Sequence, residues 1–276
     1  MKRSKITILL AIVLGMTFHS CLDLEPQDQL GGKNMWTSVN DYKQFANTFY
    51  SWTRDFSSVV YDGTHSDKRS DLITYQSYNE FSRGINSIPS SDANYTDNYK
   101  HIRRTNLLLQ NAEAYAKPED IKQYIGEAYF FRAYSYFDLL QLYGDVIITK
   151  KPLDITDPEM KVKRNDRSEV VDLIIDDLNH AVENLPAFKE LTTEEEGRIS
   201  KEGAQAFLSR VALYEGTWQK SRNGNQNTQR SANLLDIAAK AARTVIDAKY
   251  GYTFRLFGTD SETKILGDSA QKYMFI

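Results

Sequence analysis

The chain has 276 residues, of which 34 are lysine or arginine and 37 are aspartate or glutamate, so its formal net charge is −3. Nucleic-acid-binding proteins need a basic surface that neutralises phosphates, and this slightly acidic balance argues against that class. It argues equally against docking on anionic lipid headgroups through a basic face. The length is sufficient for a packed core in one large domain or two modest ones.

The first 20 residues have the three parts of a secretory signal peptide. Three positive residues, Lys2, Arg3 and Lys5, precede an apolar stretch from Ile6 to Phe18. This stretch is too short to cross a bilayer core of about 30 Å as a permanent helix. We therefore expect residues 1–20 to be removed after export.

Cys21 is the only cysteine of the chain and directly follows this segment. The sequence Phe18-His19-Ser20-Cys21 resembles a bacterial lipobox, although Phe18 and His19 depart from the usual leucine and small residue. An incidental buried thiol is the alternative interpretation. We predict that Cys21 carries the lipid anchor, that residues 21–37 form a flexible acidic tether, and that the lipid is the chain's only membrane contact.

Apolar residues recur with helical spacing from residue 41 to about 54, with Ser38 or Asn40 as the candidate helix cap. From residue 55 to 94 no helical period holds for more than a few residues, and Ser, Asp, Asn, Gly and Pro are frequent. Irregular segments of this length often have a function beyond connecting two elements.

The irregular segment mixes aromatic rings with carboxylate, amide and guanidinium groups. Sugar rings stack their C–H faces on flat aromatic side chains, while polar groups bind the sugar hydroxyls. For any one of these aromatics, packing is the more frequent role. The ligand-binding candidates are Trp52, Tyr61, Asp67, Arg69, Tyr75, Tyr78 and Asn79.

Helical periodicity dominates the rest of the chain, with breaks at proline, glycine or polar loops. A short extended piece is expected at residues 146–149, after Gly144 and Asp145. Small residues recur where helices must approach closely, as in helical repeats. The sequence thus predicts a mostly α fold: a tetratricopeptide-like helical-repeat scaffold of antiparallel helix pairs with long irregular surface loops. The predicted helices are 95–116, 118–143, 168–185, 201–220 and 232–249.

The sequence from Gly126 to Val146 contains a motif specific enough to name a family. It reads Gly-Glu-Ala-Tyr-Phe-Phe-Arg-Ala-Tyr-Ser-Tyr-Phe-Asp-Leu-Leu-Gln-Leu-Tyr-Gly-Asp-Val. It resembles the Arg-Ala-x-x-Tyr-Phe-x-Leu and Tyr-Gly-Asp-Val-Pro hallmark of the SusD/RagB family, with Ile147 in place of the proline. The stretch that begins Cys21-Leu-Asp-Leu-Glu-Pro resembles the family's mature N-terminus, and residues 197–218 resemble its later repeat helices.

The resemblance implies a surface-exposed outer-membrane lipoprotein of the Bacteroidetes type. Such proteins bind nutrient oligosaccharides and deliver them to a SusC-like TonB-dependent transporter, and they need no catalytic residue, cofactor or metal. Family members are usually much longer. We therefore expect residues 38–276 to be a SusD-like helical-repeat domain that lacks the C-terminal half.

Two other functions remain open from the sequence. The chain could be a structural or docking lipoprotein without its own ligand binding, or a glycan-degrading enzyme. A glycosidase needs two opposed carboxylates, and no acidic residue here has a recognisable catalytic context. The histidines lack the spacing of a zinc site. Peptide-type nutrients also remain open as ligands.

Within the hallmark, Arg132 and Asp138 could form a functional pair. We interpret them instead as scaffold, with the arginine anchoring neighbouring backbone. The aromatic run from Tyr129 to Phe137 covers most of the helix circumference, which is typical of a helix buried between neighbours. Trp218 is expected to pack at a helix end.

Overall fold

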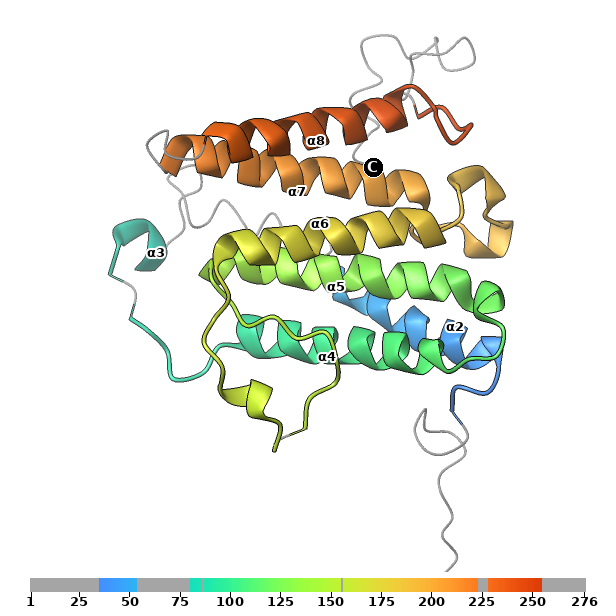
Figure 1. Cartoon of the computed structure of the whole chain (residues 1–276), viewed down its shortest axis with the longest axis horizontal. Helices are drawn as coiled ribbons and strands as arrows, with labels where there is room; N and C mark the ends of the chain where they lie inside the picture. Colours follow the sequence, from blue (N-terminus) through green and yellow to red (C-terminus); the bar gives the residue numbers. More distant parts are fainter. Residues whose placement is uncertain (1–34, 54–79, 86, 155, 223–227, 255–276) are drawn as a thin grey trace, which may run out of the picture.

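The computed structural model describes residues 35–53, 80–85, 87–154, 156–222 and 228–254. Within these ranges the chain is a stack of α-helices joined by loops and 3-10 turns (Figure 1). A single isolated antiparallel bridge, between Val146 and Asn165, is the β-structure of the described residues. The predicted mostly α fold is confirmed, and the extended piece at 146–149 contributes its first residue to that bridge.

The first helix of the described residues, α2 (Val39–Asn47), continues into the 3-10 helix η1 (Thr48–Trp52). Ser38 is the cap: its hydroxyl accepts from the Asp41 N–H, and the Asp41 carboxylate accepts from the Ser38 N–H at 2.8 Å. We expected one helix to about residue 54. The α-helix ends earlier, because at Thr48 the backbone changes to 3-10 pairing, in which the Thr48 N–H donates to the Phe45 carbonyl three residues before it.

Part of the segment predicted as irregular is helical. A short helix, α3, covers Glu80–Arg83, and α4 (Ala93–Glu113) begins before residue 95. Asp92 caps α4, because its carboxylate accepts from the Asn94 N–H at 2.9 Å. Residues 54–79 of that segment lie outside the described ranges.

The remaining elements follow the predicted helices closely. The main difference lies between the predicted helices 201–220 and 232–249, where α7 continues to Arg222 and α8 already begins at Thr228. The elements are η4 (Pro118–Ile121), α5 (Lys122–Tyr143), η5 (Pro158–Lys161), α6 (Arg167–Asn184), η6 (Phe188–Glu190), η7 (Thr193–Glu195), α7 (Lys201–Arg222) and α8 (Thr228–Ile246).

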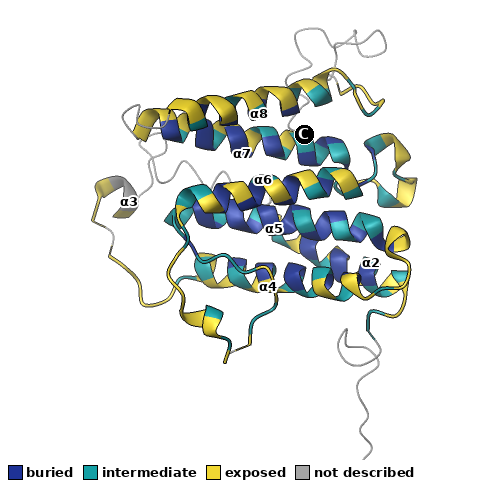
Figure 2. Cartoon of the chain, in the orientation of Figure 1, coloured by how far each residue is buried: buried dark blue, intermediate teal, exposed yellow. Residues whose placement is uncertain are grey.

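Helices α4 to α8 lie side by side in chain order, and α2 packs behind α4 and α5 (Figure 1). Helix α5 is the most buried of them (Figure 2). Of the aromatic run on α5, Tyr129 and Tyr134 are half-buried and the others, Phe130, Phe131, Tyr136 and Phe137, are buried. The run is therefore core, as the pattern predicted.

Two glycines allow close contact between helices. A Cβ on Gly126 of α5 would lie 2.9 Å from both the backbone nitrogen and Cγ of Leu185, at the end of α6. A Cβ on Gly216 of α7 would lie 2.9 Å from Cγ of Leu235 on α8. Neighbouring helices in the stack thus meet where the sequence supplies the smallest residue.

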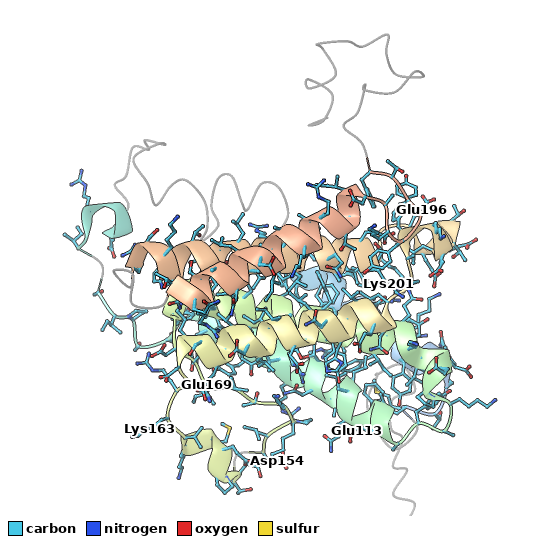
Figure 3. The ribbon with its side chains drawn as sticks, turned by 45° about the horizontal axis from the view of Figure 1, so that its top comes forward. Glu113, Asp154, Lys163, Glu169, Glu196 and Lys201 are labelled. Carbon is cyan, nitrogen blue, oxygen red and sulfur yellow. The ribbon has the colours of Figure 1, made fainter. Side chains whose placement is uncertain are left out.

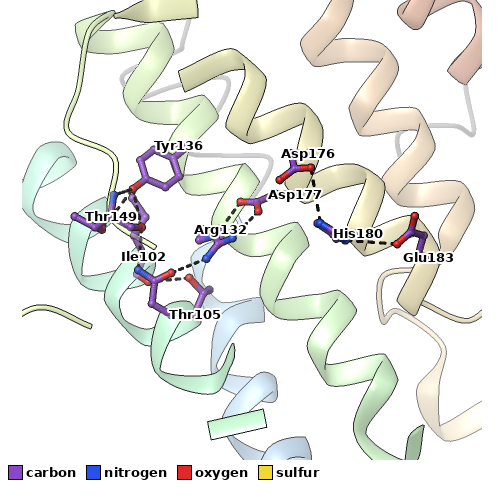
Figure 4. A network of polar contacts seen from close by, with 10 residues as sticks. Ile102, Thr105, Arg132, Tyr136, Thr149, Asp176, Asp177, His180 and Glu183 are labelled. Carbon is purple, nitrogen blue, oxygen red and sulfur yellow. Dashed lines mark hydrogen bonds and ion pairs between the residues drawn. The ribbon is translucent and has the colours of Figure 1, made fainter. Parts of the chain in front are cut away.

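A buried ion pair joins three helices at the centre of the hallmark (Figure 4). Arg132 donates to both carboxylate oxygens of Asp177 on α6, at 2.8 and 2.6 Å, and to the Asn106 side-chain oxygen on α4 at 2.8 Å. Arg132 therefore anchors side chains rather than the backbone we expected. Asp138 does not pair with it, because Asp138 accepts from Asn98 at 2.8 Å.

Two further arginines make comparable buried contacts. Arg198, in the loop before α7, donates to both oxygens of Glu127 on α5 at 2.8 and 2.7 Å. Arg167, at the start of α6, donates to Glu215 on α7 at 2.9 Å. Because both glutamates are fully buried, these pairs fix which helix faces which.

Among the helices that the structure describes, none is long and apolar enough to span a membrane.

Candidate ligand-binding site

One of the seven ligand-binding candidates lies in a described part of the chain. Trp52 is half-buried at the end of η1. Cys21 and the other six candidates lie outside the described residues; the six are Tyr61, Asp67, Arg69, Tyr75, Tyr78 and Asn79. Trp52 is therefore the candidate whose surroundings the structure shows.

The Trp52 indole is held among aromatic rings of the scaffold. It stacks on the His101 imidazole of α4, with the ring centroids 4.1 Å apart and the planes 14° apart. It also meets the Phe131 ring of α5 edge-on at 5.9 Å, and the Phe49 ring at 4.7 Å. These contacts fix the orientation of the ring before any ligand arrives.

Trp52 borders a cavity of about 170 Å³ between η1, α4 and α5. The other side chains of this Trp52 pocket are mainly polar. Asn98 is buried and donates to Asp138, while Asp97 is exposed and accepts from Lys100 at 2.7 Å. The pocket is smaller than the roughly 300–1,000 Å³ of sites that enclose drug-sized ligands. The lining residues are Trp52, Ala93, Asn94, Asp97, Asn98, His101, Tyr134 and Asp138.

The titratable side chains of this pocket include one imidazole, His101, and two carboxylates, Asp97 and Asp138. Burial lowers the pKa of His101 to about 4, against an opposing influence from Asp97. The imidazole is therefore neutral near pH 7, with one nitrogen as donor and the other as acceptor. A tryptophan ring beside amide, carboxylate and neutral imidazole groups is suited to a sugar ring with its hydroxyls.

The loop before α7 holds η1 and its tryptophan in place. Arg198 donates to the Asn47 side chain at the end of α2, and the Ile199 N–H donates to the Tyr50 hydroxyl at 3.0 Å. Burial raises the pKa of Tyr50 well above its ordinary value, so the phenol stays neutral. Because Arg198 also binds buried Glu127, the position of Trp52 is tied to the centre of α5.

The sequence did not identify the polar partners of Trp52. His101, Asn98 and Asp97 lie on a predicted helix, where a polar residue is usually a solvated one. Arg198 carried a stronger signal, because it lies in the stretch 197–218 that resembles the family's repeat helices.

Residues 22–213 match the sequence model of the SusD-like family, described as starch-binding and associating with the outer membrane. A SusD-like protein of Formosa agariphila, P38, is 28% identical over 233 residues, which cover 77% of this chain and 42% of that protein. A second Formosa agariphila SusD-like protein, P2, is 28% identical over 80% of this chain and 45% of its own length. The chain thus spans less than half the length of these two relatives.

Solved structures show the same fold. A SusD-like protein from Bacteroides fragilis has a TM-score of 0.64 and 26% identity, over 86% of this chain and 43% of that one. A structure described as a laminarin-binding SusD-like protein has a TM-score of 0.50 and 27% identity, over 63% of this chain and 35% of that one. The predicted family and the predicted helical-repeat scaffold are both confirmed.

Proposed function

We propose a function from one premise: this chain belongs to the SusD-like family of starch-binding proteins that associate with the outer membrane. The proposal is that it binds a nutrient oligosaccharide without cleaving it. The observation that carries the proposal is the Trp52 ring, fixed against His101 in a pocket with Asn98 and Asp97 at its wall. The remaining candidates, in residues 61–79, stay predictions, because they lie outside the described residues.

The pocket suggests how a sugar would be recognised. Trp52 is already held by its stack on His101 and its edge-on contact with Phe131. Ligand binding therefore loses little side-chain entropy at this ring. The buried Asn98 is fixed by two hydrogen bonds, to Asp138 and to the Asn94 carbonyl at 2.7 Å, so the polar wall is also preorganised. With a volume of about 170 Å³ the pocket suits one ring of a longer oligosaccharide.

Binding and hydrolysis are separated by a panel of polysaccharides that includes starch and laminarin, the glycans named for relatives. The chain is run in native gels containing each polysaccharide, and the same mixtures are assayed for new reducing ends. We expect retardation in at least one gel and no released sugar. Released sugar would contradict the binding function and favour an enzyme, and the absence of retardation in every gel would favour the structural lipoprotein.

We further propose that Cys21 is lipidated and holds the protein at the outer membrane through residues 21–37, with the binding face outward. The lipobox-like sequence and the family's association with that membrane support this. Two or more acyl chains are needed for stable anchoring. Cys21→Ala should therefore leave the membrane fraction and lose incorporated radiolabelled palmitate. A Cys21→Ala protein that stays in the outer membrane would contradict the anchor.

The last part of the proposal is delivery to a SusC-like TonB-dependent transporter. Its support is the family membership, since a binding protein at the outer membrane needs a pore for its ligand. In detergent extracts of cells that carry both, the tagged lipoprotein should co-purify a SusC-like transporter. Recovery of the lipoprotein alone, from mild detergent at low salt, would contradict this step.

A further inference from the structure

The N-terminal half of α4 separates two cavities. Successive residues of an α-helix are about 100° apart around its axis. Positions 93, 94, 97, 98 and 101 therefore share one side of α4 and line the Trp52 pocket, while positions 95, 96, 99, 100 and 103 share the opposite side. The second group faces the segment 147–160, and between them lies a cavity of about 460 Å³. This cavity is called the α4–η5 pocket below.

Part of the lining of the α4–η5 pocket is apolar and aromatic. Tyr95 and Tyr99 lie with their ring centroids 4.8 Å apart at 48°, and three apolar side chains line the pocket with them, Ile147, Leu153 and Met160. Its volume lies within the range of about 300–1,000 Å³ that is usual for small-molecule sites. The two tyrosine rings and the apolar side chains beside them can accommodate the C–H face of a sugar ring.

Hydrogen bonds to α4 hold the opposite wall in place. The Tyr99 hydroxyl donates to the Ile147 carbonyl at 2.8 Å, and Asn106 donates to the Thr149 carbonyl at 3.0 Å. On the far side, the Ile148 N–H donates to the Asn165 side chain at 2.9 Å. Burial raises the pKa of Tyr99, so its hydroxyl remains a donor. The cavity is therefore part of the folded scaffold.

Three cations also line this pocket, together with one carboxylate. Lys100 and Arg103 come from α4, and Lys151, with its partner Glu159 at 2.8 Å, comes from the facing segment. Lys100 and Arg103 each lie near an aspartate outside the lining, at 2.7 and 3.9 Å. All of these ion pairs are exposed to water, which screens the attraction between their charges. An incoming anionic ligand can therefore replace the carboxylate partner of a lysine or arginine with a small loss of free energy.

The sequence around the pocket is basic although the chain as a whole is acidic. Segment 147–164 contains Lys150, Lys151, Lys161, Lys163 and Arg164, against three acidic residues. Figure 3 shows Asp154 and Lys163 on the part of this segment that extends beyond the helical stack. A local excess of cations on an acidic protein attracts anionic ligands to this part of its surface.

From the apolar side chains and the three cations of the lining, we infer that the α4–η5 pocket binds an acidic sugar: one uronic-acid residue of an oligosaccharide, with its ring on Tyr95 and Tyr99 and its carboxylate toward Arg103 and Lys151. The inference rests on the proposed function only for the class of ligand, a glycan. It places a second subsite on the side of α4 opposite Trp52, and it extends the ligand class to charged glycans.

The test compares a sugar carboxylate with its uncharged methyl ester on the same sugar. The native chain is titrated by calorimetry with trimers of galacturonate and of mannuronate, and with the fully methyl-esterified galacturonate trimer. We expect at least one acidic trimer to bind, and the ester to bind about tenfold more weakly than its acid. Because exposed charge pairs contribute modestly, Arg103→Gln and Lys151→Gln should each weaken the acid by about threefold to fivefold.

Lys163→Gln is the matched control, because it removes the same charge from the same segment at a residue outside the pocket lining. It should change the affinity less than twofold. Equal binding of acid and ester, equal effects of Lys163→Gln and Lys151→Gln, or no binding of either acidic trimer would overturn the inference. Trp52→Ala should leave the acidic trimer bound, so a failure here is distinct from a failure of neutral-glycan binding at Trp52.

Discussion

Replacing Arg132 by methionine removes the arginine that joins three helices but keeps a long apolar side chain at its position. In the native chain Arg132 is 5% exposed and Asp177 is 0% exposed. Two hydrogen bonds join them, at 2.8 and 2.6 Å, and a third joins Arg132 to Asn106. In Arg132→Met the Asp177 carboxylate therefore stays buried without its cation.

The expected cost is large because a buried charge has lost its partner. Such a loss destabilises proteins by about 3–5 kcal/mol, whereas replacing both members with apolar residues is often nearly neutral. Burial already raises the pKa of Asp177, and only Arg132 opposes that shift strongly. We expect Arg132→Met to lose about 3–5 kcal/mol in urea unfolding followed by far-UV circular dichroism. The double variant Arg132→Met, Asp177→Leu should lose less than half as much.

Lys240→Met is the control, since it breaks the exposed pair with Asp236 on α8, where the side chains are 77% and 57% accessible. It should cost less than about 1 kcal/mol. If Arg132→Met cost no more than Lys240→Met, or if the double variant were less stable than Arg132→Met alone, the scaffold role of the hallmark arginine would be refuted.

Two further predictions concern the packing and the pH dependence of the scaffold. In thermal unfolding, Gly126→Ala should destabilise the chain by about 1–2 kcal/mol, because overpacking against the Leu185 backbone outweighs the helix propensity of alanine. Gly203→Ala should be near neutral in the same assay, because the one close neighbour of its Cβ is the end of the Ile199 side chain, which can move aside. His101 has a pKa of about 4 in the folded chain against 6.5 ordinarily. Between these two values the unfolded chain binds the proton more readily, so the free energy of unfolding is highest above pH 6.5 and decreases as the pH falls toward 4. Since the ring is only partly shielded from water, we expect a loss of about 1–2 kcal/mol, measured by urea unfolding at pH 7 and pH 4.5.

Each of these has an outcome that would contradict it. Equal melting temperatures of Gly126→Ala and the native chain would mean that α5 and the end of α6 can move apart freely. His101→Phe keeps a ring against Trp52 but does not titrate, so its stability should change less than the native chain's between those pH values. Identical pH profiles of the two proteins would remove His101 as the cause.

The sequence predicted the helices well because each buries a regular set of apolar residues. The periodicity of residues 118–143 appears in the structure as η4 followed by the buried α5. Helix ends were less certain, because they depend on local changes in backbone hydrogen bonding. At Thr48 the chain passes from α2 into the 3-10 helix η1, a change that no periodic pattern contains.

Polar partners distant in sequence could not be predicted in the same way. Arg132 and Asp177 are 45 residues apart, Arg198 and Glu127 are 71 apart, and Arg198 and Asn47 are 151 apart. Helical spacing predicts which face a residue occupies, but not which face of another helix lies against it. The polar and aromatic residues that follow Trp52 in the sequence made it a binding candidate. Its stack on His101 could not be predicted, because it depends on the packing of η1 against α4.

The most direct test of the account is the effect of Trp52→Ala on glycan binding, with Trp218→Ala as control. Trp218 is another half-buried tryptophan, but it lies between the Arg167 and Arg222 guanidinium groups at the end of α7, away from the Trp52 pocket. With a retained neutral oligosaccharide and unchanged circular dichroism, Trp52→Ala should weaken the affinity at least about tenfold, which corresponds to roughly 1.4 kcal/mol. Trp218→Ala should bind as the native chain does. Native affinity in Trp52→Ala, or an equal loss in both variants, would contradict the assignment of the binding site.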